Sequence, residues 1–141
     1  MGMTDIEIRE WLHSMEIYDY DLCDGVVHVV GGVDISIRVT RIPIQFGYVS
    51  GYFNCYSNNL VSLEGCPSEV GGDFNCYSNL LVSLEGCPSE VGGDFNCINN
   101  QLTSLECGPE VVGGDFYCKD NLFKCKPDTS HIKIGGMFKW K

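Results

Sequence analysis

Residues 49–69 read VSGYFNCYSNNLVSLEGCPSE, and residues 70–90 repeat them as VGGDFNCYSNLLVSLEGCPSE. The two segments differ only at positions 50/71, 52/73 and 59/80. Residues 91–111 keep 13 of the 21 residues of the preceding unit, and a fourth unit starts at Val112 before the pattern decays. Self-similarity at a fixed period of 21 residues predicts a repeat solenoid, in which each unit buries its apolar side against its neighbours.

Each unit carries the pattern F-x-C-x-x-N-x-L-x-x-L. The alternating Phe and Cys predict a short strand with both side chains facing inward. The Asn predicts a bend, because its amide can bond backbone groups that lose their ladder partners there. Like residues therefore fall into five columns: Phe53/Phe74/Phe95/Phe116, Cys55/Cys76/Cys97/Cys118, Asn58/Asn79/Asn100/Asn121, Leu60/Leu81/Leu102/Phe123 and Leu63/Leu84/Leu105.

This pattern resembles the leucine-rich repeat (LRR) family, whose core reads L-x-x-L-x-L-x-x-N-x-L in units of 20 to 29 residues. The first Leu position departs from it and holds Ser50, Gly71, Gly92 and Gly113. The short unit with a Pro in its return segment resembles the short bacterial class, and GGDFNC…N.L.SLEGCP is similar to small repeat proteins of tailed bacteriophages. The resemblance spans roughly residues 33–125. It implies a right-handed coil with a parallel β-sheet on the concave face, and little helix beyond an N-terminal capping helix.

The flanking segments predict caps on a single domain, residues 1–141. Residues 4–25 are expected to form an N-terminal helical cap, because Thr4 and Glu7 fit a capping box ahead of an apolar stripe. That stripe, which should cover the first coil, consists of Ile8, Trp11, Leu12 and Met15.

The rest of the chain divides into three parts. Residues 26–48 are interpreted as a degenerate first coil with Val33-Asp-Ile35 at the strand position, and residues 49–125 hold the 21-residue units. Residues 126–141 are expected to form a capping strand at Phe138 and Trp140, where lysines keep the exposed edge soluble.

Composition and charge limit the classes of function. The chain has 141 residues, 44% of them hydrophobic, which suits one domain with its own core. Its net charge of −10 argues against direct binding of nucleic acid and against a basic membrane-surface protein. No apolar run approaches the ~20 residues of a membrane span. The acidic, amphipathic first 20 residues resemble neither a secretory signal nor a transit peptide.

The nine cysteines first suggest a disulfide scaffold or a metal site. A zinc site needs convergent ligands such as C-x-x-C pairs, and the sequence has none. Disulfides would require inward cysteines to reorient within regular strands. The favoured interpretation is a column of buried, reduced thiols that act as apolar fillers, with no metal and no cofactor. Reduced thiols predict a cytoplasmic protein, located in the host cytoplasm if it is phage-encoded.

Catalysis finds little support in the sequence. His13, His28 and His131 lie in unrelated segments, and no H-E-x-x-H, G-x-S-x-G or phosphate-loop motif occurs. The Gly-Gly pairs recur with the repeat period, which indicates turns. We therefore expect a protein that is not an enzyme, with no catalytic residues.

The outward positions of the predicted strands supply the candidate partner-binding face. Tyrosine is enriched at protein interfaces, but recent duplication also copies surface residues that are not used, so both interpretations stay open. The stacked aspartates are expected to disfavour the fold slightly. The twelve candidate residues are Tyr52, Asn54, Tyr56, Asp73, Asn75, Tyr77, Asp94, Asn96, Ile98, Asp115, Tyr117 and Lys119.

Charge is segregated along the chain, because no Lys or Arg occurs between Arg41 and Lys119. The acids in this stretch include a second ladder, Glu64/Glu85/Glu106. Such a field attracts basic surfaces, could mimic the phosphates of a nucleic acid, and could bind a divalent cation, although no D-x-D-x-D-type loop is present. A solvated surface that keeps the protein soluble is the plainest alternative.

Three hypotheses of function follow. The first is a non-enzymatic protein–protein interaction module that binds through the concave face. The phage resemblance implies that its partner is a host protein, such as a defence component, that is inhibited in the infected cell. Such a partner is expected to have a basic or mixed surface. The second is an acidic nucleic-acid mimic that occupies a DNA- or RNA-binding protein. The third is a structural or self-associating module. We expect a monomer or weak homodimer with no membrane association.

Overall fold

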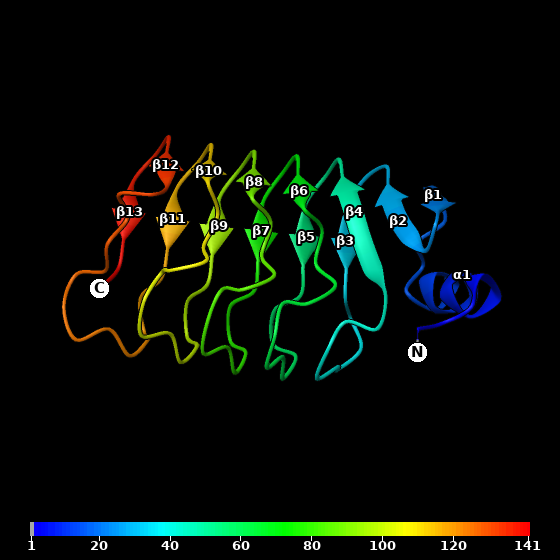
Figure 1. Cartoon of the computed structure of the whole chain (residues 1–141), viewed down its shortest axis with the longest axis horizontal. Helices are drawn as coiled ribbons and strands as arrows, with labels where there is room; N and C mark the ends of the chain where they lie inside the picture. The colour runs from blue at the N-terminus through cyan, green and yellow to red at the C-terminus, as the bar shows by residue number, and fades with distance from the viewer. Residues whose placement is uncertain (1) are drawn as a thin grey trace.

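The computed structural model describes residues 2–141 and shows a parallel β-solenoid with one short helix at its N-terminal end (Figure 1). The strands form two sheets that run the length of the stack. Sheet A consists, in spatial order, of β1 (Tyr20–Cys23), β2 (Val26–Val29), β4 (Gln45–Val49), β6 (Glu69–Val70), β8 (Glu90–Val91), β10 (Val111–Val112) and β12 (Lys133–Ile134). Sheet B consists of β3 (Val33–Asp34), β5 (Phe53–Asn54), β7 (Phe74–Asn75), β9 (Phe95–Asn96), β11 (Phe116–Tyr117) and β13 (Phe138–Lys139).

The register of the strands follows the repeat. Phe53 pairs with Phe74 and Phe74 with Phe95, so equivalent residues of successive units lie side by side. Val33 pairs with Phe53, which confirms the strand predicted in the degenerate first coil. Phe138 pairs with Phe116, which confirms the predicted final strand. All of these pairs are parallel, as a solenoid requires.

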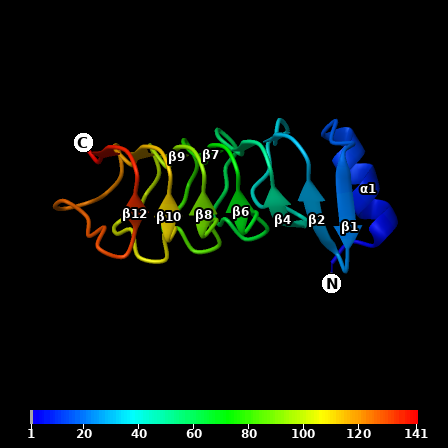
Figure 2. The ribbon, with the colours of Figure 1, turned by 90° about the horizontal axis from the view of Figure 1, so that it is seen from above.

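The second sheet was not predicted. The sequence analysis expected one sheet on a concave face, but the return segment of each unit forms its own parallel strand through the column Val49, Val70, Val91 and Val112. The Gly-Gly pairs make the corner between the two sheets, where successive coils come so close that a Cβ at Gly92 would clash with the carbonyl of Gly71. Figures 1 and 2 show a nearly straight stack.

The core is a set of side-chain ladders along the solenoid axis. The phenylalanines at the start of the sheet B strands are fully buried, with ring centroids 4.8 to 5.9 Å apart from Phe53 to Phe116. Burial of each such ring stabilises the fold by roughly 1.5–3 kcal/mol. The cysteine and leucine columns fill the remaining space and are likewise buried, from Cys55 to Cys118 and from Leu60 to Leu105.

The asparagine column forms the third side of the coil, as predicted. The Asn79 amide nitrogen donates to the carbonyls of Cys55 and Cys76, at 3.0 Å each, and its oxygen accepts from the Leu60 N–H at 3.0 Å. One side chain therefore ties its own coil to the preceding one. Asn58 and Asn100 bond in the same way and are equally buried. Within residues 2–141, no buried side-chain nitrogen or oxygen lacks a partner.

The N-terminal cap combines a helix with a hairpin. Helix α1 (Asp5–Ser14) has the predicted capping box at Thr4 and buries Ile8 and Leu12 against the first coil. The predicted helical cap over residues 4–25 was too long, because β1 and β2 form an antiparallel hairpin after α1 (Figure 2). Asp24 and Gly25 turn this hairpin with positive φ values of 50° and 77°, a two-residue D-G turn that the sequence analysis overlooked.

The C-terminal segment contains two strands where one was predicted. Ile134 pairs with Val112 in sheet A, and the following Gly-Gly pair turns the chain into β13 of sheet B. Phe138 and Trp140 are half-buried, and Phe138 packs on Phe116 with ring centroids 5.7 Å apart. Among the described residues, no helix is long and apolar enough to cross a bilayer.

Candidate binding face

All twelve predicted residues lie on, or next to, the outward side of four neighbouring strands of sheet B. Because β5, β7, β9 and β11 are in register, residues one period apart form three parallel rows along the solenoid. Tyr52 and Tyr56 are the exposed large hydrophobic side chains among the twelve, at 44% and 38% of their surface. The structure therefore brings the predicted residues together on one face.

Two stacked tyrosines form the aromatic centre of this face. The rings of Tyr56 and Tyr77 lie 4.9 Å apart with an interplanar angle of 4°. Stacking restricts both rings before any partner arrives, which lowers the entropy lost on binding. Tyr52 adds a third ring, which covers Gly32 so closely that any Cβ at that glycine would clash with it.

The aspartate row has a structural role that the sequence analysis missed. One oxygen of Asp73 accepts the N–H of Asp94 at 2.7 Å, Asp94 accepts the N–H of Asp115 at 2.7 Å, and Asp115 accepts the N–H of Met137 at 2.8 Å. Each carboxylate thus joins its coil to the next at the corner between the sheets. The expected weak destabilisation by stacked like charges is offset by these charge-assisted bonds.

The end of this row near the C-terminus is the most strongly bonded. The backbone N–H of Met137 and the hydroxyl of Tyr117, which donates at 2.9 Å, hold the pKa of Asp115 below its ordinary value. The same hydroxyl bond raises the pKa of Tyr117. The Lys139 ammonium lies 5.6 Å from the centre of the Tyr117 ring, so this end of the face is cationic.

The asparagine row of the face also serves the backbone. The side-chain oxygen of Asn75 accepts the N–H of Tyr77 at 3.3 Å, and that of Asn96 accepts the N–H of Ile98 at 3.0 Å. These bonds fix the chain where each strand ends. Asp and Asn therefore recur in the repeat because their side chains accept hydrogen bonds from the backbone. The exposed tyrosine rings have no such structural role.

A small hollow beside the tyrosines was not predicted. It measures about 300 Å³ and is lined by Asp34, Ser36, Arg38, Tyr56, Ser57 and Asn58. Asp34 occupies the same row as Asn54, with which it pairs, so the register of the degenerate first coil could have revealed its position. Arg38 places a positive charge next to the aromatic centre of an acidic protein.

A larger hollow lies elsewhere, at the turn side near the C-terminal end. It measures about 800 Å³, and its lining includes Glu106, Lys124, Lys126, Asp128 and His131. Charges of both signs line it, and the His131 ring nitrogen is engaged with the Leu105 carbonyl at 2.9 Å. None of the twelve predicted residues contributes to it.

The cysteines are thiols with no disulfide among the residues described. Cys55, Cys76, Cys97 and Cys118 form the buried column, where burial raises the pKa of Cys118 to about 12. Cys66 is also buried, Cys87 is half-buried, and Cys23, Cys107 and Cys125 are exposed. Within residues 2–141, no group of three or more His, Cys, Asp or Glu side chains is arranged to hold a metal ion.

Comparison of the chain with protein-family models, with curated proteins and with solved structures finds no match. The candidate site is therefore defined by the chain's own geometry. It is a face with four exposed or half-exposed tyrosines, a fixed polar framework and a neighbouring arginine.

Proposed function

We propose that the protein is a non-enzymatic interaction module that binds another protein through the outer face of sheet B. The observation that carries this proposal is the rigid, exposed stack of Tyr56 and Tyr77, flanked by Tyr52. Aromatic side chains with restricted rotamers dominate the binding energy of many protein interfaces. The side-chain oxygens of the outward aspartates and asparagines accept hydrogen bonds from the backbone. The tyrosine rings are therefore the groups of this face that are available for contact with a partner.

The same proposal covers the family of the chain and the nature of its partner. We regard the chain as a short LRR protein of the bacterial or bacteriophage type, and its partner as a host protein in the cytoplasm with a basic or mixed surface. The repeat period and the asparagine ladder support the family assignment, and the net charge of −10 favours a partner with basic groups. The second sheet is a departure from the single sheet that this family implies.

The test compares variants that remove exposed tyrosine rings from sheet B and from sheet A. Tyr56→Ala combined with Tyr77→Ala removes the aromatic centre of sheet B. Tyr48→Ala removes one tyrosine, 42% exposed, from sheet A. We expect the wild type and the Tyr48 variant to capture the same partner from a host lysate, and the double variant to lose it. Loss with the Tyr48 variant alone would assign binding to sheet A and refute the proposal.

A second candidate function is the acidic nucleic-acid mimic. It is favoured by the stretch between Arg41 and Lys119, which has nine acids and no Lys or Arg. The aspartates among them are already bonded to backbone N–H groups, which leaves the glutamates of the turn side and of sheet A as the free charges. Capture that is abolished by salt and insensitive to the tyrosine pair would favour the mimic over the tyrosine face.

A further inference from the structure

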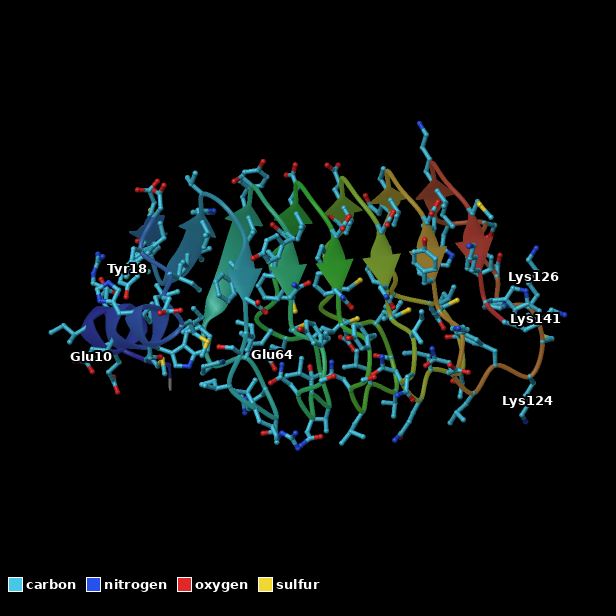
Figure 3. The ribbon with its side chains drawn as sticks, turned by 180° about the vertical axis from the view of Figure 1, so that it is seen from behind. Glu10, Tyr18, Glu64, Lys124, Lys126 and Lys141 are labelled. Carbon is cyan, nitrogen blue, oxygen red and sulfur yellow. The ribbon has the colours of Figure 1, made fainter. Side chains whose placement is uncertain are left out.

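The two ends of the solenoid carry opposite charge. We call residues 2–25 the head, which holds seven acids and one base, for a net charge of −6. We call residues 119–141 the tail, which holds six lysines and two aspartates, for a net charge of +4. All of these head acids and tail lysines are exposed. Figure 3 shows Glu10 and Tyr18 at one end of the molecule and Lys124, Lys126 and Lys141 at the other.

The register of the last coil directs some of its backbone groups away from the stack. In the preceding coil, the N–H of Phe116 donates to the Met137 carbonyl at 2.8 Å and that of Cys118 to the Lys139 carbonyl at 2.9 Å. By the same register, the N–H groups of Phe138 and Trp140 point to a coil that would follow. Within the described residues, β13 is the last strand of sheet B, so these two donors face outward.

The other sheet leaves acceptors at the same end. The Val112 and Gly114 carbonyls accept from Gly135 and Gly136, at 2.8 Å each. The corresponding carbonyls of the last coil, those of Ile134 and Gly136, have no following coil among residues 2–141. The tail therefore presents donors along sheet B and acceptors along sheet A, together with half-buried aromatic rings.

The head has the complementary character. Its acids, Glu10, Asp19 and Asp21 among them, lie on helix α1, in the segment after it and on β1. Two large apolar side chains accompany these carboxylates, Ile6 with 71% and Tyr18 with 68% of its surface exposed. β1 is the terminal strand of sheet A at this end, as β12 is at the other. The head therefore offers carboxylates together with exposed apolar side chains to the lysines and aromatic rings of the tail.

We propose that the tail of one molecule binds the head of a second copy of the same chain, so that the protein associates head to tail. A tail-to-tail dimer would bring two lysine-rich ends together, and a head-to-head dimer two acidic ends. Of these three pairings of the ends, only the head-to-tail arrangement brings opposite charges together, and it offers carboxylates to the N–H groups of Phe138 and Trp140. Such a contact is heterologous and does not close on itself, so it produces chains whose length depends on concentration. The outer face of sheet B stays free along these chains.

The test uses charge reversal at each end. The head variant carries Glu10→Lys, Asp19→Lys and Asp21→Lys, and the tail variant carries Lys126→Glu, Lys133→Glu and Lys141→Glu. These positions avoid the capping box and the turn residues with positive φ. Circular dichroism melts establish that both variants fold. Sedimentation velocity then gives the mass as a function of concentration at salt concentrations of about 0.01 M and about 1 M, where the screening length falls from roughly 30 Å to 3 Å.

We expect the wild-type mass to rise with concentration at low salt and to return to that of the monomer at high salt. Each variant alone should stay monomeric, because the substitutions remove the charge attraction between its ends. The head of the head variant changes from −6 to 0 and no longer attracts the tail, and the tail of the tail variant changes from +4 to −2 and is repelled by the head. A mixture of the two variants should associate again, since each supplies the end that the other lacks. Recovery in the mixture distinguishes charge pairing between ends from a general effect of the substitutions.

A second readout locates the contact. The chain has two tryptophans, Trp11 near the head and Trp140 in the tail. In a Trp11→Phe background, the emission of Trp140 should shift to shorter wavelength as the wild-type ends associate. Three results would overturn the proposal: a wild type that stays monomeric at low salt, a mass that stops at a dimer, and a tail variant that associates like the wild type. If the wild type stays monomeric at low salt, the lysine-rich tail would instead be expected to bind an acidic partner protein.

Discussion

At the scale of single residues, the buried asparagine of each unit makes more hydrogen bonds to the backbone than the other polar side chains of that unit. Asn79 is 6% exposed, and it accepts from backbone N–H groups of the preceding coil while it donates to the carbonyls of both coils. Removing it leaves buried N–H and C=O groups without partners, because no water reaches them easily. The cost of each such group is about 1–3 kcal/mol.

We therefore expect Asn79→Ala to lower the free energy of unfolding by about 1–3 kcal/mol or more. The matched control is Asn59→Ala, in the same turn of the preceding coil. Asn59 is exposed, and its column holds Leu80, Gln101 and Leu122, so its loss should change stability by less than about 0.5 kcal/mol. Urea unfolding followed by circular dichroism measures both variants. Equal midpoints for Asn79→Ala and the wild type would contradict the role assigned to the ladder.

Cys107 occupies a position that favours glycine. Gly65 and Gly86 stand two periods and one period before it, with φ values of 94° and 92°. Cys107 keeps a positive φ of 65° because the Gly and Cys of this turn are exchanged. A side chain in this conformation costs roughly 1–2 kcal/mol. Cys107→Gly should therefore raise the free energy of unfolding by about that amount. Cys107→Ala removes the thiol but keeps the strain, so a gain of equal size in that variant would refute the explanation.

At the scale of strands and turns, the sequence alone predicted the elements that a characteristic set of residues marks. The F-x-C alternation located sheet B, and the Thr4 capping box located α1. Sheet A was missed because its regular strands are two residues long and each contributes a single inward Val, too little for an alternation to be visible. The alternation also predicted which side chains of sheet B point outward. It did not reveal the bonds of the aspartates to the next coil, since these depend on how closely two coils approach at the glycine corner.

The strand ladders also predict how the thiols react. Cys23, Cys107 and Cys125 are exposed, whereas the column from Cys55 to Cys118 is buried and burial raises the pKa of Cys87 and Cys118 to about 12. A thiol reagent attacks the thiolate, so at pH 8 the exposed cysteines should react in the native protein and the others only after unfolding. Mass spectrometry should show three rapid additions in the folded state and nine in denaturant. Rapid labelling of the buried column in buffer would mean that the stack opens far more easily than its packing implies.

At the scale of the whole molecule, stability is distributed along the stack. Each coil contacts only its two neighbours, so the total approximates a sum of coil energies and interfaces between coils. The unit of residues 70–90 is flanked by interfaces of the same register, because Phe74 pairs with Phe53 on one side and with Phe95 on the other. Removing a whole period joins Glu69 to Val91 and recreates the Glu-Val step found at residues 69–70 and 90–91. The caps at both ends stay in place.

Deletion of residues 70–90 should therefore give a folded, shorter solenoid with a lower unfolding midpoint. The remaining coils keep their Phe, Cys, Asn and Leu columns in register, so the far-ultraviolet circular dichroism per residue should stay close to that of the wild type. Deletion of residues 70–79 is the matched control. It shifts the later columns by ten residues and places Gly86 where Cys is needed, Ser89 where Asn is needed and Asp94 where Leu is needed, so that variant should not fold cooperatively. If both deletions unfold alike, the periodic core is not what holds the molecule together, and long-range contacts between its ends would have to supply the cooperativity.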